Sequence, residues 1–134
     1  MTSSEENLEI AHRVYEAIHA HDAKAAIALM APSFRGVASD GMPDSLGGTY
    51  EGPKSMLHDC WGRVYARFDA RPEPEEFIPV APDRVIVIGR YLGTGRASGR
   101  PLSAAFVHVM RFADGHVTEL IQITDTGRWR DALD

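Results

Sequence analysis

A chain of 134 residues is close to the common size of one domain, and it can bury a sizeable core. With 44% hydrophobic and 25% charged residues, it has the composition of an ordinary globular protein. The net charge of −5 and the scattered arginines disfavour a nucleic-acid partner, because binding to phosphates requires a basic surface.

The single cysteine, Cys60, excludes an internal disulfide and fits a reducing cytosol. The first residues are polar and acidic and lack the basic and apolar segments of a signal peptide. The apolar runs are too short to span a membrane. We therefore expect a cytoplasmic protein that does not associate with membranes.

The first third of the chain has a helical pattern. Ser3 and Glu6 have the spacing of a capping box, and apolar residues then recur at helical spacing as far as Ile18. Asp22 is placed to cap a second helix, which Pro32 ends.

A short strand is expected from Phe34 to Ala38, followed by a glycine-rich loop at residues 40–48. Pro53 then begins a third helix, since proline is favoured in the first turn. Its apolar stripe consists of Leu57, Cys60, Trp61, Val64 and Phe68.

From Arg71 onward the hydrophobic period becomes that of β-strands. We expect a three-residue hairpin loop at Ala113-Asp114-Gly115, with the glycine in the left-handed conformation. Helices followed by a strand meander predict an α+β fold. The expected strands cover residues 75–80, 85–92, 104–112 and 117–124.

This order of elements resembles the NTF2-like superfamily, and within it the SnoaL-like polyketide cyclases and the ketosteroid-isomerase-like proteins. Three segments carry the resemblance, at residues 14–22, 48–53 and 106–115. The resemblance implies one domain over residues 1–134, in which three N-terminal helices pack on a curved antiparallel sheet around a pocket.

The loop length decides which side chains of the last two strands face that pocket. With a three-residue loop, His108 lies opposite Leu120, and the inward face carries Phe106, His108, Met110, Leu120 and Gln122. A two-residue loop would instead turn Gln122 outward and Asp125 inward, because a slip of one residue inverts the faces. The sequence leaves these alternatives open.

His108 interrupts an otherwise apolar strand face. A neutral imidazole can accept a proton from a substrate and return it, so His108 is a candidate general acid and base. The resemblance places it where ketosteroid isomerase uses an acid to donate a hydrogen bond to the developing enolate. The alternative is a core histidine that is hydrogen-bonded to Gln122 or Tyr15.

Two tyrosines are further candidates. The hydroxyl of Tyr15 is placed to polarise a carbonyl, although a satisfied core tyrosine is the alternative. Tyr91 shares its strand face with Gly89 and Gly93, and these glycines are expected to leave room beside it in the pocket.

Two aspartates are weaker candidates. Asp40 is the acid nearest to the position of the ketosteroid isomerase general base, but it falls in a loop. Asp125 is either a pocket residue or the N-cap of a C-terminal helix at residues 126–133.

The leading hypothesis is a SnoaL-like enzyme without cofactor or metal, which cyclises or isomerises an apolar, oxygenated substrate by removing a proton next to a carbonyl. The alternative is a non-catalytic ligand-binding or association module. We also expect a homodimer, because the outward sheet face carries Val107, Val109, Ile121 and Ile123. The expected apolar wall of the pocket consists of Trp61, Tyr91, Phe106, Met110 and Leu120.

Overall fold

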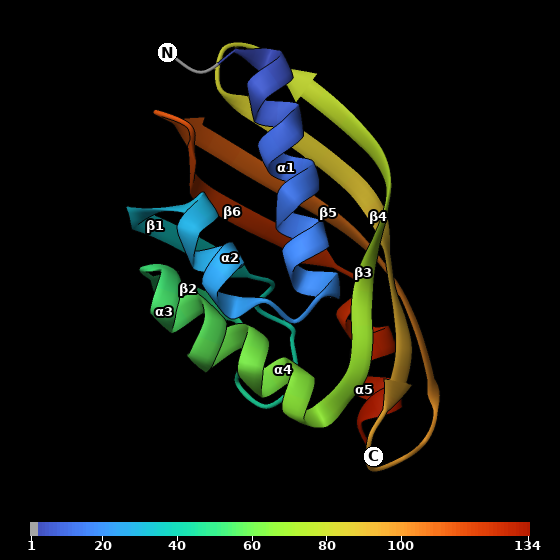
Figure 1. The fold of residues 1–134 in the computed structure, drawn as a ribbon. Helices are drawn as coiled ribbons and strands as arrows, with labels where there is room; N and C mark the ends of the chain where they lie inside the picture. Colours follow the sequence, from blue (N-terminus) through green and yellow to red (C-terminus); the bar gives the residue numbers. More distant parts are fainter. Residues whose placement is uncertain (1–2) are drawn as a thin grey trace.

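Six strands form one curved sheet, and the helices gather mainly on its concave side (Figure 1). The computed structural model describes residues 3–134. Neighbouring strands follow the order β2-β1-β6-β5-β4-β3, and all pairs are antiparallel except β1 with β6. The strands are β1 (Met30–Ala38), β2 (Gly48–Glu51), β3 (Phe68–Val80), β4 (Arg84–Gly95), β5 (Pro101–Ala113) and β6 (His116–Thr124).

Helices α1 (Ser4–His19) and α2 (Ala23–Leu29) begin at the two predicted caps. The Ser3 hydroxyl accepts a hydrogen bond from the Glu6 N–H at 3.1 Å, and the Asp22 carboxylate accepts one from the Ala25 N–H at 3.0 Å. The predicted end of the second helix at Pro32 is wrong, because β1 already begins at Met30.

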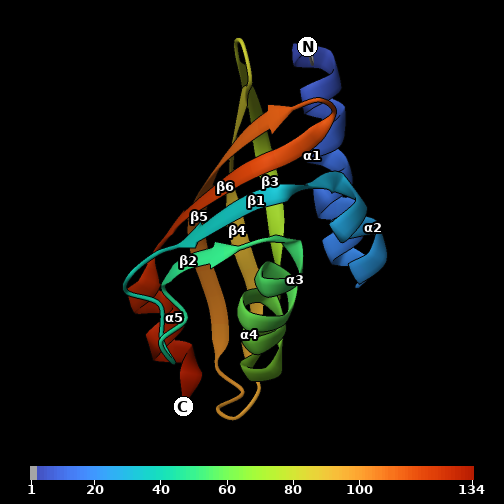
Figure 2. The same ribbon diagram turned by 90° about the vertical axis from the view of Figure 1, so that its left-hand side faces the viewer.

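The third helical stretch is divided into α3 (Pro53–Ser55), the π-helix η1 (Met56–Trp61) and α4 (Gly62–Arg67). A π-helical turn is wider than an α-helical one and is often found at functional sites. A last helix, α5 (Thr126–Leu133), buries Trp129 against Phe68, with the rings 4.9 Å apart. Figure 2 shows α1, α2 and the α3–α4 stretch along one side of the sheet, with α5 at its lower end.

The hairpin between β5 and β6 differs from the prediction. Its loop has two residues, Asp114 and Gly115, both with positive φ, and Ala113 pairs with His116. A bulge at Thr118 then inserts one extra residue, and the Thr118 hydroxyl donates to the Arg111 carbonyl at 3.2 Å.

The loop is one residue shorter than predicted and the bulge adds one residue, so the side chains beyond the bulge keep the predicted directions. His108 lies opposite Gln122, not opposite Leu120, and Phe106 lies opposite Thr124. The predicted pairs are therefore wrong, but His108 and Gln122 share the concave face as expected.

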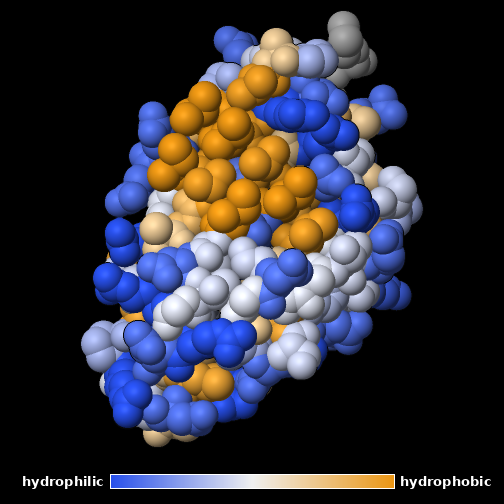
Figure 3. Space-filling model, turned by 180° about the vertical axis from the view of Figure 1, so that it is seen from behind, coloured by the Kyte–Doolittle hydropathy of each residue, from blue (hydrophilic) through white to orange (hydrophobic). Residues whose placement is uncertain are grey.

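The opposite face of the sheet carries an apolar patch, which is visible in Figure 3. The strand register places its side chains in two rows across β4, β5, β6 and β1, the four inner strands of the sheet. We call this set the outer apolar patch, and Ile88 and Ile123 are its most exposed members, at 37% and 57%. It consists of Val37, Ile86, Ile88, Val107, Val109, Ile121 and Ile123.

None of the helices in residues 3–134 has both the length and the apolar character needed to cross a membrane.

Candidate functional site

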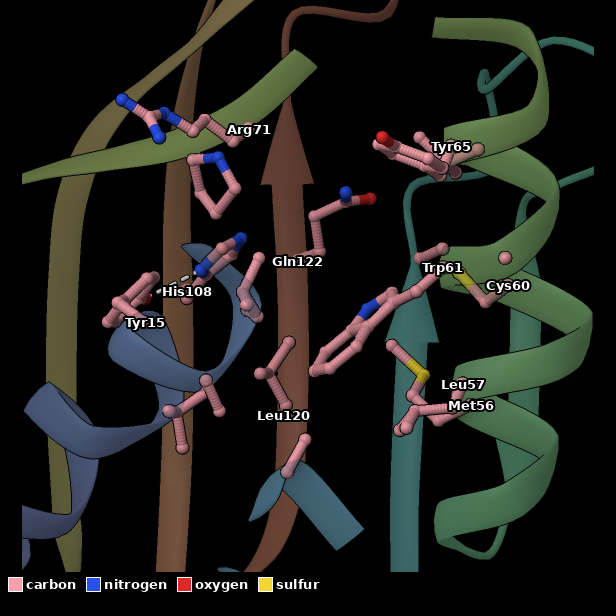
Figure 4. Close-up of a pocket in the computed structure, with 18 of the residues that line it drawn as sticks. Tyr15, Met56, Leu57, Cys60, Trp61, Tyr65, Arg71, His108, Leu120 and Gln122 are labelled. Carbon is pink, nitrogen blue, oxygen red and sulfur yellow. Dashed lines mark hydrogen bonds between the residues drawn. The ribbon is translucent and has the colours of Figure 1, made fainter. Parts of the chain in front are cut away.

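The concave side of the sheet encloses a cavity of about 300 Å³ between α1, α2, η1 and α4. This volume is in the range of small-molecule sites, which are mostly apolar with a few polar groups that fix orientation. The Trp61 indole projects from η1 into the hollow, opposite Leu120 and Gln122 on β6 (Figure 4). Other apolar wall residues are Val14, Met56, Leu57 and Met110.

Four polar side chains meet at one wall of this cavity, and we call them the polar cluster: Tyr15, Tyr91, His108 and Gln122. The hydroxyl oxygen of Tyr15 lies 2.7 Å from His108 Nδ1, and that of Tyr91 lies 2.7 Å from His108 Nε2. Gln122 Nε2 donates to the Tyr91 hydroxyl at 3.0 Å. Both ring nitrogens of the buried imidazole are therefore paired with tyrosines.

Two further residues hold the cluster in place. The ring of Phe106 stacks on the imidazole, with centroids 4.1 Å apart and an angle of 19° between the planes. Phe106 thus lies behind His108 and is not part of the cavity wall, which corrects the expectation of a substrate contact. Ser39, just after β1, donates its N–H to Gln122 Oε1 at 3.2 Å and its hydroxyl to the Gln122 carbonyl at 3.0 Å.

All four members of the polar cluster are uncharged near neutral pH, and burial ensures this for His108. It lowers the pKa of His108 to about 3, because a charged imidazole would lose its hydration. Burial also raises the pKa of Tyr15 and that of Tyr91. A neutral imidazole has one N–H donor and one bare nitrogen, so one tyrosine donates to His108 and the other accepts from it.

The acids singled out from the sequence lie elsewhere. Asp40 is exposed in the loop after β1, and Asp125 is exposed before α5, where it pairs with Arg128 at 3.7 Å. Neither lines the cavity. Within residues 3–134, the one carboxylate on the cavity wall belongs to Asp22, which is occupied in capping α2.

The glycines of β4 do not make room for a ligand. A Cβ atom at Gly89 would lie 2.3 Å from the Glu73 carbonyl oxygen and 2.7 Å from Phe106 Cζ. The space beside Gly89 is therefore filled by β3 and by the ring behind His108. Tyr91 still lines the cavity, through its position on the concave face.

Cys60 lines the cavity from η1, and burial raises its pKa to about 11. The thiol therefore stays protonated and unreactive near neutral pH. Among residues 3–134, no group of three or more His, Cys, Asp or Glu side chains is placed to hold a metal ion.

Some residues of the site carry no signal in the local sequence pattern. Ser39 reaches Gln122 only because β1 runs parallel to β6, a pairing between segments far apart in the chain. Met56, which lies outside the predicted apolar stripe of the third helix, lines the cavity from the π-helix. Tyr65 and His21 also line the cavity, with ring centroids 4.8 Å apart, and the Arg96 guanidinium carbon lies 4.4 Å from the centroid of the Tyr65 ring.

Comparison with known proteins identifies a family and several similar structures. Residues 11–120 match the family model of the SnoaL-like domain. An NTF2-like protein of unknown function from Burkholderia pseudomallei K96243 is 31% identical with a TM-score of 0.87, covering 96% of this chain and 97% of its own. TerC, crystallised with polyporic acid, is 28% identical with a TM-score of 0.86, covering 96% and 98%.

A more distant structure shows the fold alone. A protein of Jannaschia sp. CCS1 assigned to the SnoaL-like polyketide cyclases is 21% identical, with a TM-score of 0.81 and coverage of 96% and 92%. The chain matches no curated protein sequence.

Proposed function

Because the chain belongs to the SnoaL-like domain family, we propose that it is a small-molecule enzyme that removes a proton next to a carbonyl and so cyclises or isomerises its substrate. The substrate is a mostly apolar, oxygen-bearing molecule, and no cofactor takes part. In the proposal a protein hydroxyl stabilises the enolate oxygen, and a water molecule accepts the carbon-bound proton and returns one when the product forms. The cytoplasm remains the compartment we expect for this protein.

The polar cluster is the observation that carries this proposal. Burying four polar side chains in an otherwise apolar cavity costs free energy, unless all of them are hydrogen-bonded or contact a ligand. A hydroxyl that is fixed in such a site stabilises the negative charge that develops on a carbonyl oxygen when the neighbouring carbon loses its proton. The cluster therefore acts on the oxygen end of the reacting group.

This geometry changes the role expected for His108. Both of its nitrogens lie 2.7 Å from tyrosine hydroxyls, so the imidazole has no free nitrogen for direct contact with a substrate. Its lowered pKa of about 3 also makes it a weak base. In the proposal His108 holds the tyrosines, and Tyr15 or Tyr91 contacts the substrate.

Loss of a carbon-bound proton can be measured without knowing the product. We suggest incubating the protein with 1-tetralone, a cyclic aryl ketone, in deuterated water and following deuterium uptake next to the carbonyl by mass spectrometry. The wild type should accelerate exchange, and Tyr15→Phe and Tyr91→Phe should show which hydroxyl is responsible, with a loss of about 10²-fold or more for that one. The enzyme proposal would be refuted if the wild type and the double variant, with both Tyr15→Phe and Tyr91→Phe, gave equal exchange rates across a panel of bound ketones.

A non-catalytic ligand-binding role is the second candidate. It is favoured by one observation: the polar cluster holds no carboxylate that could serve as a base among the described residues. Polyporic acid is the first compound to test for binding, because TerC was crystallised with it. Tight binding with no exchange of any bound ketone would favour this role.

We also propose that a second copy of the chain covers the outer apolar patch. Its two rows of β-branched side chains lie on a broad, regular sheet face, and such patches on isolated domains usually mark contact sites. Two-fold pairing would bury the same residues on both copies.

A further inference from the structure

The hydrogen-bond partners of the polar cluster contain information on where its protons lie. Ser39 fixes the orientation of the Gln122 amide, because the Ser39 backbone N–H is only a donor. It points at Gln122 Oε1 at 3.2 Å, so this atom is the amide oxygen and the amide nitrogen faces Tyr91. Gln122 therefore donates to the Tyr91 hydroxyl, and Tyr91 accepts.

The Tyr91 hydroxyl has one hydrogen to donate. A hydroxyl that accepts one hydrogen bond becomes a better donor in the next, so bonds in a chain favour one common direction. The remaining neighbour of the Tyr91 oxygen is His108 Nε2 at 2.7 Å. Tyr91 then donates to this nitrogen, which must be bare, and His108 carries its proton on Nδ1.

His108 Nδ1–H donates to the Tyr15 oxygen, which lies 2.7 Å away. Tyr15 accepts this bond and keeps its own hydroxyl hydrogen for another acceptor. The reverse order would make Tyr91 accept from both Gln122 and His108, and would leave its hydrogen without an acceptor although its oxygen already has two neighbours.

We infer that the hydrogen bonds run in one direction, from Gln122 through Tyr91 and His108 to Tyr15, so that Tyr15 presents its hydroxyl hydrogen to an oxygen acceptor of the ligand. The ligand class is then a neutral or anionic oxygen compound, such as a ketone, enolate or phenolate. Tyr15 is the catalytic residue, and Gln122, Tyr91 and His108 are positioning residues. The statement on the ligand rests on the proposed function, whereas the statement on proton positions does not.

Nuclear magnetic resonance tests the proton positions directly. In the ligand-free protein at pH 7, a ¹⁵N–¹H correlation of the His108 ring should show a proton on Nδ1 and a bare Nε2. The variant Gln122→Glu matches the wild type in size but replaces the amide donor by a carboxylate acceptor. It should reverse the chain and move the His108 proton to Nε2. A wild-type proton on Nε2 overturns the inference. So does a variant that keeps its proton on Nδ1 alone at a pH where the ¹³C shift of the new carboxyl shows it to be ionised.

Ligand binding tests the other end of the chain. 1-Tetralone and tetralin share one ring system, and only the ketone has an acceptor, so quenching of tryptophan fluorescence by each compound isolates the hydrogen bond. The ratio of the Kd for tetralin to the Kd for 1-tetralone should be about tenfold larger in the wild type than in Tyr15→Phe. Gln122→Glu should lose this preference too, and an unchanged preference in Tyr15→Phe overturns the role of Tyr15. If the proton positions are as inferred but the wild type accelerates deuterium exchange of no bound ketone in the panel, only the enzyme proposal fails.

Discussion

The free energy of unfolding should depend on pH because of one buried side chain, His108. Its pKa is about 3 in the folded chain, whereas its ordinary value is 6.5. Between these values the unfolded chain binds a proton that the folded chain does not, so stability falls as the pH falls. The contribution is fully present above pH 6.5 and is lost progressively down to about pH 3.

The size of the effect follows from these two pKa values. Lowering the pH from 7 to 5 protonates His108 almost only in the unfolded chain, which removes about 2 kcal/mol of stability. The groups that face the ring are the hydroxyls of Tyr15 and Tyr91, both uncharged in this range, so they add no slope of their own.

The assay is urea unfolding at pH 7 and pH 5, at one protein concentration, for the wild type and for His108→Phe. The variant is expected to be less stable at both pH values, because it leaves two tyrosine hydroxyls without their partner. What matters is the change between the two pH values, which should be about 2 kcal/mol smaller in the variant. His108→Gln serves as a second variant if the first does not fold. Equal changes in wild type and variant, within about 0.5 kcal/mol, would refute a neutral buried imidazole.

Three further predictions follow from packing and exposure. Cys60 should resist a thiol reagent at pH 7 in the folded protein and react once urea unfolds it, since its pKa is about 11; rapid native labelling would contradict this. Gly89→Ala should destabilise the fold by about 1–3 kcal/mol because its Cβ meets the Glu73 carbonyl and Phe106, whereas Gly127→Ala, with a nearest contact of 3.5 Å, should be nearly neutral in thermal unfolding. Ile123→Lys should shift a dimer toward monomer in analytical ultracentrifugation, and a monomeric wild type at micromolar concentration would contradict the proposed pairing.

Local chemistry made much of the fold predictable. The caps at Ser3 and Asp22 follow from short-range spacing, and the structure confirms both. The concave position of His108 follows from strand alternation. The α+β class and the family resemblance are confirmed by the sheet with its helices and by the match over residues 11–120.

The parts that sequence reasoning missed depend on contacts between distant segments. Ser39 orients Gln122 only through the parallel pairing of β1 with β6, which no local pattern encodes. Phe106 and His108 share one strand face and their rings stack, so that His108 separates Phe106 from the cavity. The π-helix Met56–Trp61 shares the apolar spacing of an ordinary helix, so periodicity does not distinguish them.

The bulge at Thr118 has a consequence for changes in chain length. Phe112 pairs with Val117 and Arg111 with Glu119, so Thr118 is one residue more than the ladder requires. Deleting Thr118 should keep every pair from Arg111 to Phe106 and leave the Gln122 amide inside the cavity, at the cost of the hydroxyl bond to the Arg111 carbonyl. Deleting Ile121 should instead send that amide to the solvent side, because the pleat has a period of two. The hairpin thus has one position at which it tolerates shortening while the interior keeps its chemistry.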